Sequence, residues 1–299
     1  MTPEALARYL EERRLQVDAA LGRYLPEAGD HPKEIHEAVR YSVFAGGKRL
    51  RPILVLAAAE AAGGQVEHAL PAAAAIELIH TYSLIHDDLP AMDDDDFRRG
   101  RPTCHKVYGE ALAILAGDAL LTQAFILLSG EPSSLRADTV ARLRVINEIA
   151  QAAGSRGMVG GQVVDILQED REVDLATLLY LHTHKTGSLI RACLRVGGII
   201  SSAGSEQMEA LTRYGDRIGL AFQIVDDILD LEGSLEALGK RAGSDLRKKK
   251  ATFPGLLGLE ESRQRARSLV AEAKHTLSVF GDRGTALGAI ADYVVARRR

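Results

Sequence analysis

Residues 77–93 read ELIHTYSLIHDDLPAMD, an apolar run that contains one tyrosine and ends in a cluster of carboxylates. The apolar residues recur at helical spacing, which predicts a buried helix up to the paired aspartates Asp87 and Asp88. Asp93 follows Asp87 by six positions, which is not a neighbour spacing in a helix, and Pro90 lies between them. We therefore expect the helix to end or distort here, so that Asp87 and Asp93 converge.

A second segment, GLAFQIVDDILD at residues 219–230, has the same organisation, with an apolar helical run that ends in paired aspartates. Asp226 and Asp230 are four positions apart, so a helix places them on one face with Asp227 beside them. Taken alone, this segment also fits an exposed helix face that carries acidic residues. Two such segments in one chain favour a binding role, because carboxylates among apolar residues need compensating partners.

The rest of the chain has the composition of a helical protein. It has 299 residues, of which 46% are hydrophobic, with nine prolines and no tryptophan. Long stretches rich in alanine and leucine favour helices, and no alternating runs of β-preferring residues indicate strands. Short turn signals such as AAGGQ and SSAGS separate the segments, and none resembles an interdomain linker. We expect an all-α fold in a single domain, residues 1–299, with an exposed loop after Asp230.

Charge and cysteine content argue against several classes of protein. The net charge of −4 and the interleaving of acidic with basic residues give no reason to expect a nucleic-acid partner. Cys104 and Cys193 stand alone, without disulfide or zinc-site spacing, which is typical of a reducing cytosol. The N-terminus lacks the apolar core of a secretory signal, and no uncharged stretch is long enough to span a bilayer. We expect a soluble, cytoplasmic protein without a membrane span.

The two carboxylate clusters suit magnesium. Mg²⁺ takes hard oxygen ligands, keeps several waters, and is typically held by one or two carboxylates together with phosphate oxygens of a substrate. The clusters therefore predict a site for a metal-bound phosphate compound. The candidate metal ligands are Asp87, Asp88, Asp93, Asp226, Asp227 and Asp230. We interpret the following Asp94, Asp95 and Asp96 as solvated or as indirect contributors.

Basic and polar residues near both clusters could contact such phosphates. The stretch GGKRLRP at residues 46–52 lacks the GxxxxGK[ST] pattern of nucleotide-binding loops, and taken alone it fits an ordinary basic turn. His80 is seven positions before Asp87, nearly on the same helix face, although a buried core histidine is the simpler interpretation of it. Gln162 and Asp165, three apart, also face one side of a helix. The candidates for phosphate contacts are Lys48, Arg49, Arg51, His80, Arg98, Arg99, Lys185, Thr186, Gln223 and Lys240.

Together, GGKRLRP, HTYSLIHDDLPAMDDDDFRRGRPTCH, HTHKTGSL, FQIVDDILD and GKRAGSD resemble the trans-isoprenyl diphosphate synthases, and most closely the bacterial farnesyl type. The match runs from Gly46 to Asp245 in the family's order, and the paired aspartate-rich motifs with RRG and GGKR are highly specific. The resemblance implies the isoprenoid synthase fold, an all-helical homodimer whose central cavity holds both motifs on facing walls. It implies head-to-tail (1'-4) condensation of isopentenyl diphosphate with dimethylallyl or geranyl diphosphate to farnesyl diphosphate and diphosphate.

The resemblance also implies residue roles. Metals and lysines would stabilise the departing diphosphate in a water-poor cavity, so no protein nucleophile is needed. About three Mg²⁺ ions would be bound, with Mn²⁺ as a substitute. The implied catalytic set is Asp87, Asp88, Asp93, Arg98, Lys185, Asp226 and Lys240. Contacts to the allylic diphosphate would come from Arg98, Lys185, Gln223 and Lys240, with Thr186 nearby, and contacts to isopentenyl diphosphate from Lys48, Arg51, His80 and Arg99. The basic C-terminal ARRR resembles the family's closing tail with less specificity.

Product length is predicted to depend on Tyr82 and Ser83, which precede Asp87 by five and four positions. An aromatic residue here, together with the DDxxxxD form of the first motif, resembles the bacterial farnesyl type, in which bulk stops elongation. The alternative for Tyr82 is ordinary core packing. Geranylgeranyl diphosphate synthases share the insertion and form the alternative product class.

Three other classes fit less well. Terpene cyclases typically carry a different second metal motif, whereas here DDxxD recurs. An HD-type metal phosphohydrolase, suggested by His86 and Asp87, would leave GGKR and the second cluster unexplained. A non-catalytic subunit of a hetero-oligomeric prenyl synthase would be expected to have lost some acidic ligands, and all are present here.

Overall fold

The structure is a computed structural model that describes residues 1–130, 138–168, 171–238 and 251–297, with backbone alone for residues 234–238. The elements up to the first aspartate cluster are α1 (Pro3–Tyr24), α2 (Lys33–Val43), α3 (Leu50–Ala61) and α4 (Val66–Asp87). The elements that follow are β1 (Phe97–Arg98), β2 (Arg101–Pro102), α5 (Cys104–Tyr108), α6 (Glu110–Ser129), α7 (Thr139–Ala153), α8 (Met158–Leu167), α9 (Leu175–His182), the π-helical turn η1 (Thr183–Gly187), α10 (Ser188–Ile200), α11 (Ser205–Leu238), α12 (Phe253–Leu257), α13 (Leu259–Thr276), the 3₁₀ segment η3 (Leu277–Gly284) and α14 (Thr285–Ala296).

Almost every described element is a helix, so the predicted all-α fold is confirmed. The exception is the small antiparallel pair β1 and β2, in which Phe97 lies opposite Pro102. This hairpin follows the first aspartate cluster directly. It turns the chain so that the basic residues after the cluster lie back against the end of α4.

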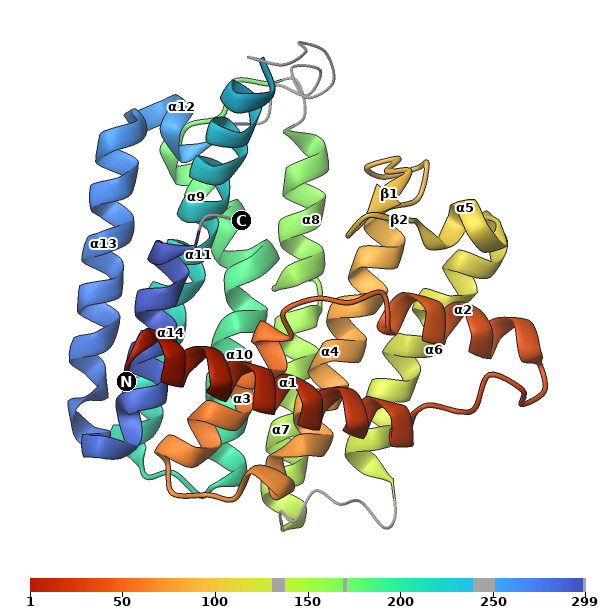
Figure 1. Ribbon diagram of the computed structural model, residues 1–299, viewed down its shortest axis with the longest axis horizontal. Coiled ribbons are helices and arrows are strands. Elements are labelled where there is room, and N and C mark those ends of the chain that lie inside the picture. Colours follow the sequence, from red (N-terminus) through yellow and green to blue (C-terminus); the bar gives the residue numbers. More distant parts are fainter. Residues whose placement is uncertain (131–137, 169–170, 239–250, 298–299) are drawn as a thin grey trace.

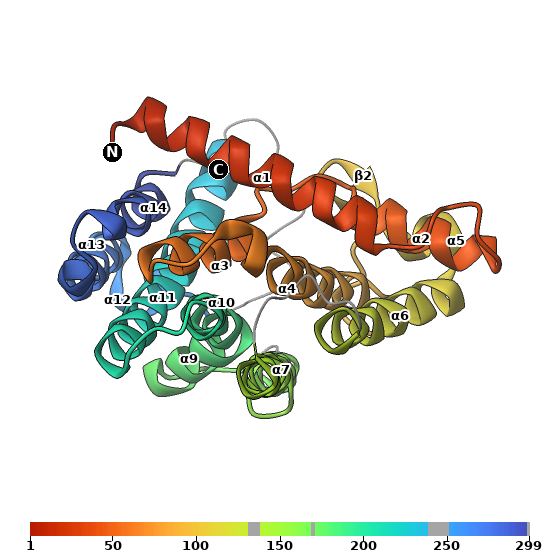
Figure 2. The ribbon, with the colours of Figure 1, turned by 90° about the horizontal axis from the view of Figure 1, so that it is seen from below.

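The centre of the bundle consists of α3, α4, α10 and α11, and α1 lies across one side of it over α3 and α4 (Figures 1 and 2). α3 and α4 are apolar on nearly all sides, and such helices are stable only when they are buried. Small residues allow close packing here. A Cβ atom on Gly197 of α10 would lie 2.4 Å from the carbonyl oxygen of Val55 on α3, so this approach requires glycine. Buried apolar residues form one cluster from α1 to α14, while the single-domain division over 1–299 stays a prediction.

α4 and α11 run in the same direction, so their carboxyl ends lie at the same end of the molecule (Figure 1). This brings both aspartate segments to that end. α4 ends at Asp87, and the chain then turns so that the amide of Asp93 donates a hydrogen bond of 2.8 Å to the carbonyl oxygen of Asp87. The predicted end of the helix, with Asp93 brought back to Asp87, is therefore confirmed.

The expected loop directly after Asp230 is wrong, because α11 continues to Leu238. The residues after Asp230 are mostly good helix formers, and one interior glycine, Gly233, costs only about 1 kcal/mol relative to alanine. Glu232 also forms an ion pair with Arg263 of α13, which fixes this part of α11 to its neighbour.

Among the described helices, α6 is the one that is long and apolar enough to cross a membrane by length and composition, and 33% of its most apolar stretch is buried in the molecule. Core helices of soluble proteins pass the same test. α6 carries Glu110 and Asp118, which agrees with the expectation that no uncharged stretch has bilayer length. It packs against α4 and α2 and exposes Ile114, Leu115 and Ile126.

Candidate active site

Most of the candidate residues line three cavities beside the two aspartate segments of α4 and α11. The first, of about 370 Å³, is lined by Asp87, Tyr82 and Ser83 of α4 and by apolar residues of α8. The second, of about 190 Å³, is lined by Asp227, Asp230 and other residues of the second cluster. The third, of about 340 Å³, lies beside the GGKR loop.

The three cavities share lining residues, which means that they adjoin. Lys185 and Thr186 border both the first and the second cavity. Arg51 and His80 border both the first and the third cavity. Residues from distant parts of the sequence therefore line three adjoining cavities, in which aspartates line the first and second and most of the arginines line the third.

Asp87 is the half-buried carboxylate at the end of α4. Burial raises its pKa to about 6, and the nearby Asp93 and Asp88 act in the same direction, while Lys185 and Arg98 oppose them. A buried carboxyl group with a raised pKa tends to bind a cation, because its ionisation without a nearby positive charge is unfavourable. Asp93, which follows in the turn, is brought to Asp87 by the backbone hydrogen bond described above.

Asp88 is almost completely buried. It accepts hydrogen bonds from Arg98 Nε at 2.7 and 3.0 Å, and Arg98 Nη2 lies 2.5 Å from the same carboxylate. Arg98 belongs to β1, so this ion pair holds the hairpin against α4. Both residues line a fourth, small cavity together with Arg99, which also lines the third cavity.

The three aspartates after Asp93 are exposed, as one of the two interpretations predicted. Asp96 forms an ion pair of 2.6 Å with Lys106 and its side chain is 63% exposed. Asp95 lies 3.6 Å from Arg98 and is also largely exposed. The carbonyl oxygens of Asp95 and Asp96 accept hydrogen bonds from the Thr103 hydroxyl, which stabilise the turn.

In the second cluster, Asp226 contacts a residue from the end of the chain. Arg297 Nη2 lies 2.7 Å from Asp226 Oδ1, and the Arg297 guanidinium stacks over the Phe222 ring at 3.8 Å. Burial raises the pKa of Asp226, and Arg297 opposes that shift. Asp226 is not among the residues that line the three cavities, whereas Arg297 lines the third.

The Asp227 carboxylate contacts residues of two other helices. Its Oδ2 lies 3.1 Å from Nε2 of the buried His182 and accepts a hydrogen bond of 2.9 Å from the amide of Phe253. The ring of His182 stacks on that of Phe253. Asp227 thus joins α11 to α9 and to α12. Asp230 is exposed and lines the second cavity with Gln223.

Lys185 and Thr186 lie in the π-helical turn η1, an irregularity that is frequent at functional sites. Lys185 Nζ lies 2.6 Å from Asp165 of α8. The approach of α8 to η1 requires a glycine at position 161, because a Cβ there would be 2.2 Å from the Lys185 amide nitrogen. Gln162, on the same helix, lines the first cavity, and its Oε1 is buried without a hydrogen-bond partner among the described residues.

The residues predicted to bind isopentenyl diphosphate gather around the third cavity. Arg51 Nη1 lies 3.3 Å from His80 Nε2. Burial lowers the pKa of His80 well below its usual value, and Arg51 adds to that shift, so His80 is neutral at pH 7. Arg99 donates a hydrogen bond to the carbonyl oxygen of Gly46, and Lys48 is exposed, with Nζ 6.0 Å from the centre of the Tyr293 ring.

Lys240, predicted to contact the allylic diphosphate, lies outside the described residues. Three residues that the sequence argument missed are important in the structure. His182 and Glu77 are the first residues of two of the quoted stretches, but nothing in their spacing indicates their partners, Asp227 and Arg49, which are distant in sequence. Arg297 belongs to the basic ARRR end, which the sequence indicated only as a weak resemblance.

The carboxylates fit magnesium only if a substrate completes its coordination. Within the described ranges, no three His, Cys, Asp or Glu side chains converge tightly enough to hold an ion on their own. Pairs of carboxylates do lie close enough to repel each other. Asp93 raises the pKa of Asp87, and Asp230 raises that of Asp226. One or two carboxylates with phosphate oxygens and water are the usual ligands of Mg²⁺. The donor set therefore suits a metal that arrives with a diphosphate.

The raised pKa of Asp87 predicts a pH-dependent stability. Because its pKa rises from 3.8 to about 6 on folding, its stabilising contribution is complete below about pH 3.8 and is lost as the pH rises through 6. Asp87→Asn, which resembles the protonated form, should match the wild type near about pH 4 and exceed its free energy of unfolding by up to about 3 kcal/mol near about pH 7.5. Denaturant titrations with chelator present test this.

The matched control is Asp96→Asn, since Lys106 lowers the pKa of the exposed Asp96. That variant should gain no stability over the wild type as the pH rises from acid to neutral. Parallel pH profiles for Asp87→Asn and the wild type would contradict the prediction.

Comparisons with known proteins agree with this geometry. Residues 32–279 match the family described as Polyprenyl synthetase. The chain is 48% identical over 293 residues to a dimethylallyltranstransferase of Fischerella ambigua, covering 98% of this chain and 84% of that protein. It is 47% identical over 293 residues to a geranylgeranyl diphosphate synthase of Cyanophora paradoxa, with 98% and 96% covered. It is 45% identical over 292 residues to the farnesyl diphosphate synthase of Bacillus subtilis, with 98% of each covered.

A solved structure is similar over the same extent. The apo crystal structure of an FPP/GFPP synthase from Zymomonas mobilis superimposes with a TM-score of 0.87 at 41% sequence identity. The superposition covers 98% of this chain and 100% of that one. The helical architecture is therefore that of an isoprenyl synthase, as the resemblance in the sequence implied.

Proposed function

The chain belongs to the polyprenyl synthetase family, and from that premise we propose that it condenses isopentenyl diphosphate head to tail (1'-4) with dimethylallyl and geranyl diphosphates. The products are farnesyl diphosphate and inorganic diphosphate. The chain is a prenyltransferase. One observation carries the specific proposal: the cavities beside the two aspartate clusters and the GGKR loop adjoin through shared residues.

The two substrates would occupy different parts of this space. The isopentenyl diphosphate group would bind in the third cavity, where Lys48, Arg51, His80 and Arg99 offer cations and a neutral imidazole. The allylic diphosphate would lie between the aspartate clusters, within reach of Lys185 and Gln223. Its hydrocarbon chain would extend into the first cavity, whose wall on α8 is apolar except for Gln162.

Magnesium, or Mn²⁺ in its place, would be held by Asp87, Asp93 and Asp226 and would supply Lewis-acid stabilisation of the departing diphosphate. Asp88, Asp227 and Asp230 stay predicted ligands. Asp88 and Asp227 already bind Arg98 and His182, so their contribution includes holding β1 and α9 in place.

The residues of the chain would then act by position and charge. Lys185, which lies against Asp165, can turn its ammonium group toward the leaving diphosphate and stabilise the charge that develops there. Met158, Val159 and Val163 of α8 give the first cavity an apolar side, which would disfavour water where an allylic cation would otherwise be quenched. The double bond of isopentenyl diphosphate attacks this cation, and a proton then leaves to the released diphosphate.

We assign farnesyl as the product because Tyr82 and Ser83 line the first cavity below Asp87. The Tyr82 ring is buried and contacts the ring of His86 edge to face at 5.8 Å, which limits the depth of the cavity. The alternative product is geranylgeranyl diphosphate, which the name of the Cyanophora relative specifies.

A cytoplasmic homodimer is the proposed form of the enzyme. α6 is apolar, yet two of its large side chains, Leu115 and Ile126, are 55% and 53% exposed. On the adjacent α7, Val140 and Leu143 are 68% and 61% exposed. A second copy of the chain would cover this surface through a two-fold interface. Both cysteines are free thiols, which fits a reducing compartment.

Incubation of the purified chain with dimethylallyl and isopentenyl diphosphates and Mg²⁺ tests this function. We expect farnesyl diphosphate as the main product, release of diphosphate by the chain alone, and no product when a chelator removes the metal. Sedimentation of the same sample should give twice the mass of the chain. Absence of condensation with every allylic primer would refute the assignment.

A further inference from the structure

We propose that the buried ion pair between Arg49 and Glu77 is a positioning device for the isopentenyl diphosphate site. The ion pair fixes where the GGKR loop lies along α4. This inference rests on the proposed function, because it takes Lys48 and Arg51 as the residues that meet that diphosphate. The sequence predicted Arg49 as a phosphate contact, but its side chain is buried against Glu77, so that prediction is wrong, and Glu77 was given no role in the site. Their role follows from the contacts of a single guanidinium group.

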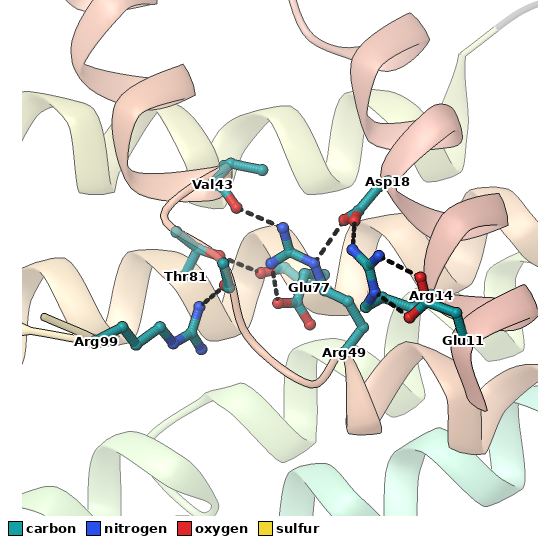
Figure 3. Close-up of polar contacts among 9 residues, drawn as sticks. Glu11, Arg14, Asp18, Val43, Arg49, Glu77, Thr81 and Arg99 are labelled. Atoms are coloured by element: carbon teal, nitrogen blue, oxygen red, sulfur yellow. Dashed lines mark hydrogen bonds and ion pairs between the residues drawn. The ribbon is translucent and has the colours of Figure 1, made fainter. Parts of the chain in front are cut away.

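The guanidinium of Arg49 has three partners from three elements (Figure 3). Nη1 donates to Glu77 Oε1 of α4 at 2.7 Å, and Nε donates to Asp18 Oδ1 of α1 at 2.8 Å. Nη2 donates to the carbonyl oxygen of Val43, the last residue of α2, at 2.7 Å. The side chains of Arg49 and Glu77 are each 2% exposed. Arg49 therefore fastens the loop to α1, α2 and α4.

The backbone of the loop depends on this anchor. Arg49 is left-handed, at φ 50° and ψ 34°, directly before α3, and Gly46 and Gly47 also have positive φ. A left-handed conformation costs a residue with a Cβ about 1–2 kcal/mol, so the guanidinium contacts must hold it. This conformation turns Arg49 into the core while Lys48, one position earlier, stays exposed.

The ion pair between Arg49 and Glu77 also fixes where the basic residues around the loop lie relative to α4. Glu77 and His80 are three positions apart and so lie on one face of α4. Arg49 contacts the first and Arg51 contacts the second, at 3.3 Å. At the other end of the loop, Arg99 donates to the carbonyl oxygen of Gly46 and lies where a side chain on residue 47 would stand. A shift of the loop would therefore alter the placement of Lys48 and break the contact of Arg99 with Gly46.

Simple electrostatics predicts a different outcome from positioning, which makes the proposal testable. Glu77 also lines the third cavity, so as a bare charge it would repel a diphosphate. Removing Arg49 and Glu77 together leaves the net charge unchanged. If the pair only adds charge or stability, the site should be unaffected by replacing both with apolar residues of similar size, a change that is often neutral or stabilising for buried pairs.

The test is the double variant Arg49→Met with Glu77→Leu. We expect KM for isopentenyl diphosphate to rise about tenfold, because small misplacements of binding groups have effects of this size or larger. KM for geranyl diphosphate should stay within about twofold, and circular dichroism should show that the double variant is folded. Some loss of melting temperature is expected, because the Val43 carbonyl loses its Arg49 donor. An unchanged or lower KM for isopentenyl diphosphate in a folded double variant overturns the proposal.

The matched control is Arg13→Met with Glu60→Leu, which removes an ion pair of 2.6 Å between α1 and α3 away from the three cavities. Its KM values should stay at those of the wild type. An equal rise of KM in this control would show that loss of any ion pair to α1 or α3 has the same effect, and would also overturn the proposal.

If the double variant does not fold, Asp18→Asn decides. Its side chain is 26% exposed and it supports Arg49 from the solvent side, where it also pairs with Arg14 at 2.8 Å (Figure 3). Positioning predicts a higher KM for isopentenyl diphosphate, whereas removal of a negative charge near a phosphate site alone predicts a lower one. An unchanged or lower value overturns the proposal. Failure of the proposed function is distinguishable, because the wild type would then form no condensation product.

Discussion

Replacing Asp87 or Asp226 by alanine should lower kcat at least about a thousandfold, equivalent to about 4 kcal/mol of transition-state stabilisation. Asp87 is the last residue of α4 and Asp226 lies within α11, and burial raises the pKa of both. The metal that either one holds would no longer bring the leaving diphosphate to Lys185. Loss of one cluster should therefore be nearly as damaging as loss of both, since the two would act on the same diphosphate.

Single-turnover rates with geranyl and isopentenyl diphosphates measure this effect, and circular dichroism verifies that the helices are intact. The control is Asp96→Ala, which removes an exposed carboxylate of the same segment and should keep kcat within about twofold, as surface ion pairs contribute little. Wild-type rates in both Asp87→Ala and Asp226→Ala would remove the proposed metal site.

Tyr82→Ala should shift the main product from farnesyl diphosphate to longer chains. The ring of Tyr82 is 7% exposed and stands in the wall of the first cavity, beside Ser83 and below Asp87. Removing it would extend the space into which the hydrocarbon chain grows, so that farnesyl diphosphate can bind again as a primer. The diphosphate contacts are untouched, so the rate of the first condensation should change little.

Chromatography of the dephosphorylated products measures the shift. Tyr82→Phe, which keeps the ring and removes only the hydroxyl, should retain farnesyl diphosphate as the main product. If Tyr82→Ala leaves the chain length unchanged, Tyr82 is ordinary core packing. A wild-type product that is already longer than farnesyl would instead favour the geranylgeranyl alternative.

The spacing of apolar and acidic residues along the sequence was sufficient to predict the helices and to find the aspartate motifs. The turn at Asp87 was predictable because Pro90 and the six-residue spacing of Asp87 and Asp93 are incompatible with a continuous helix. The extension of α11 beyond Asp230 was not, because one glycine and several charges look like a loop unless the ion pair of Glu232 with Arg263 is known. The family was recognisable because the motifs occur together and in order, and the comparisons confirm it.

Within the motifs, the sequence treats each aspartate pair as two equal carboxylates, whereas the fold makes them different. Asp87 faces the first cavity and Asp88 binds Arg98. Asp227 binds His182, 45 positions earlier in the chain, and this contact has no counterpart in local spacing. Arg49 is a further example, because it belongs to a basic stretch of sequence and yet its side chain is buried in the core.

Helical periodicity, motif order and the acidic and basic character of the site are properties of neighbouring residues, so they could be read from the amino-acid sequence without a structure. Which charged group faces substrate and which one anchors the scaffold depends on partners brought together by folding. Arg49 and Glu77 are 28 positions apart and Arg297 and Phe222 are 75 apart, so no local spacing links them. Burial of these groups in one packed interior is what selects their partners, because a charge removed from water is stable there only beside an opposite charge or a hydrogen-bonding group.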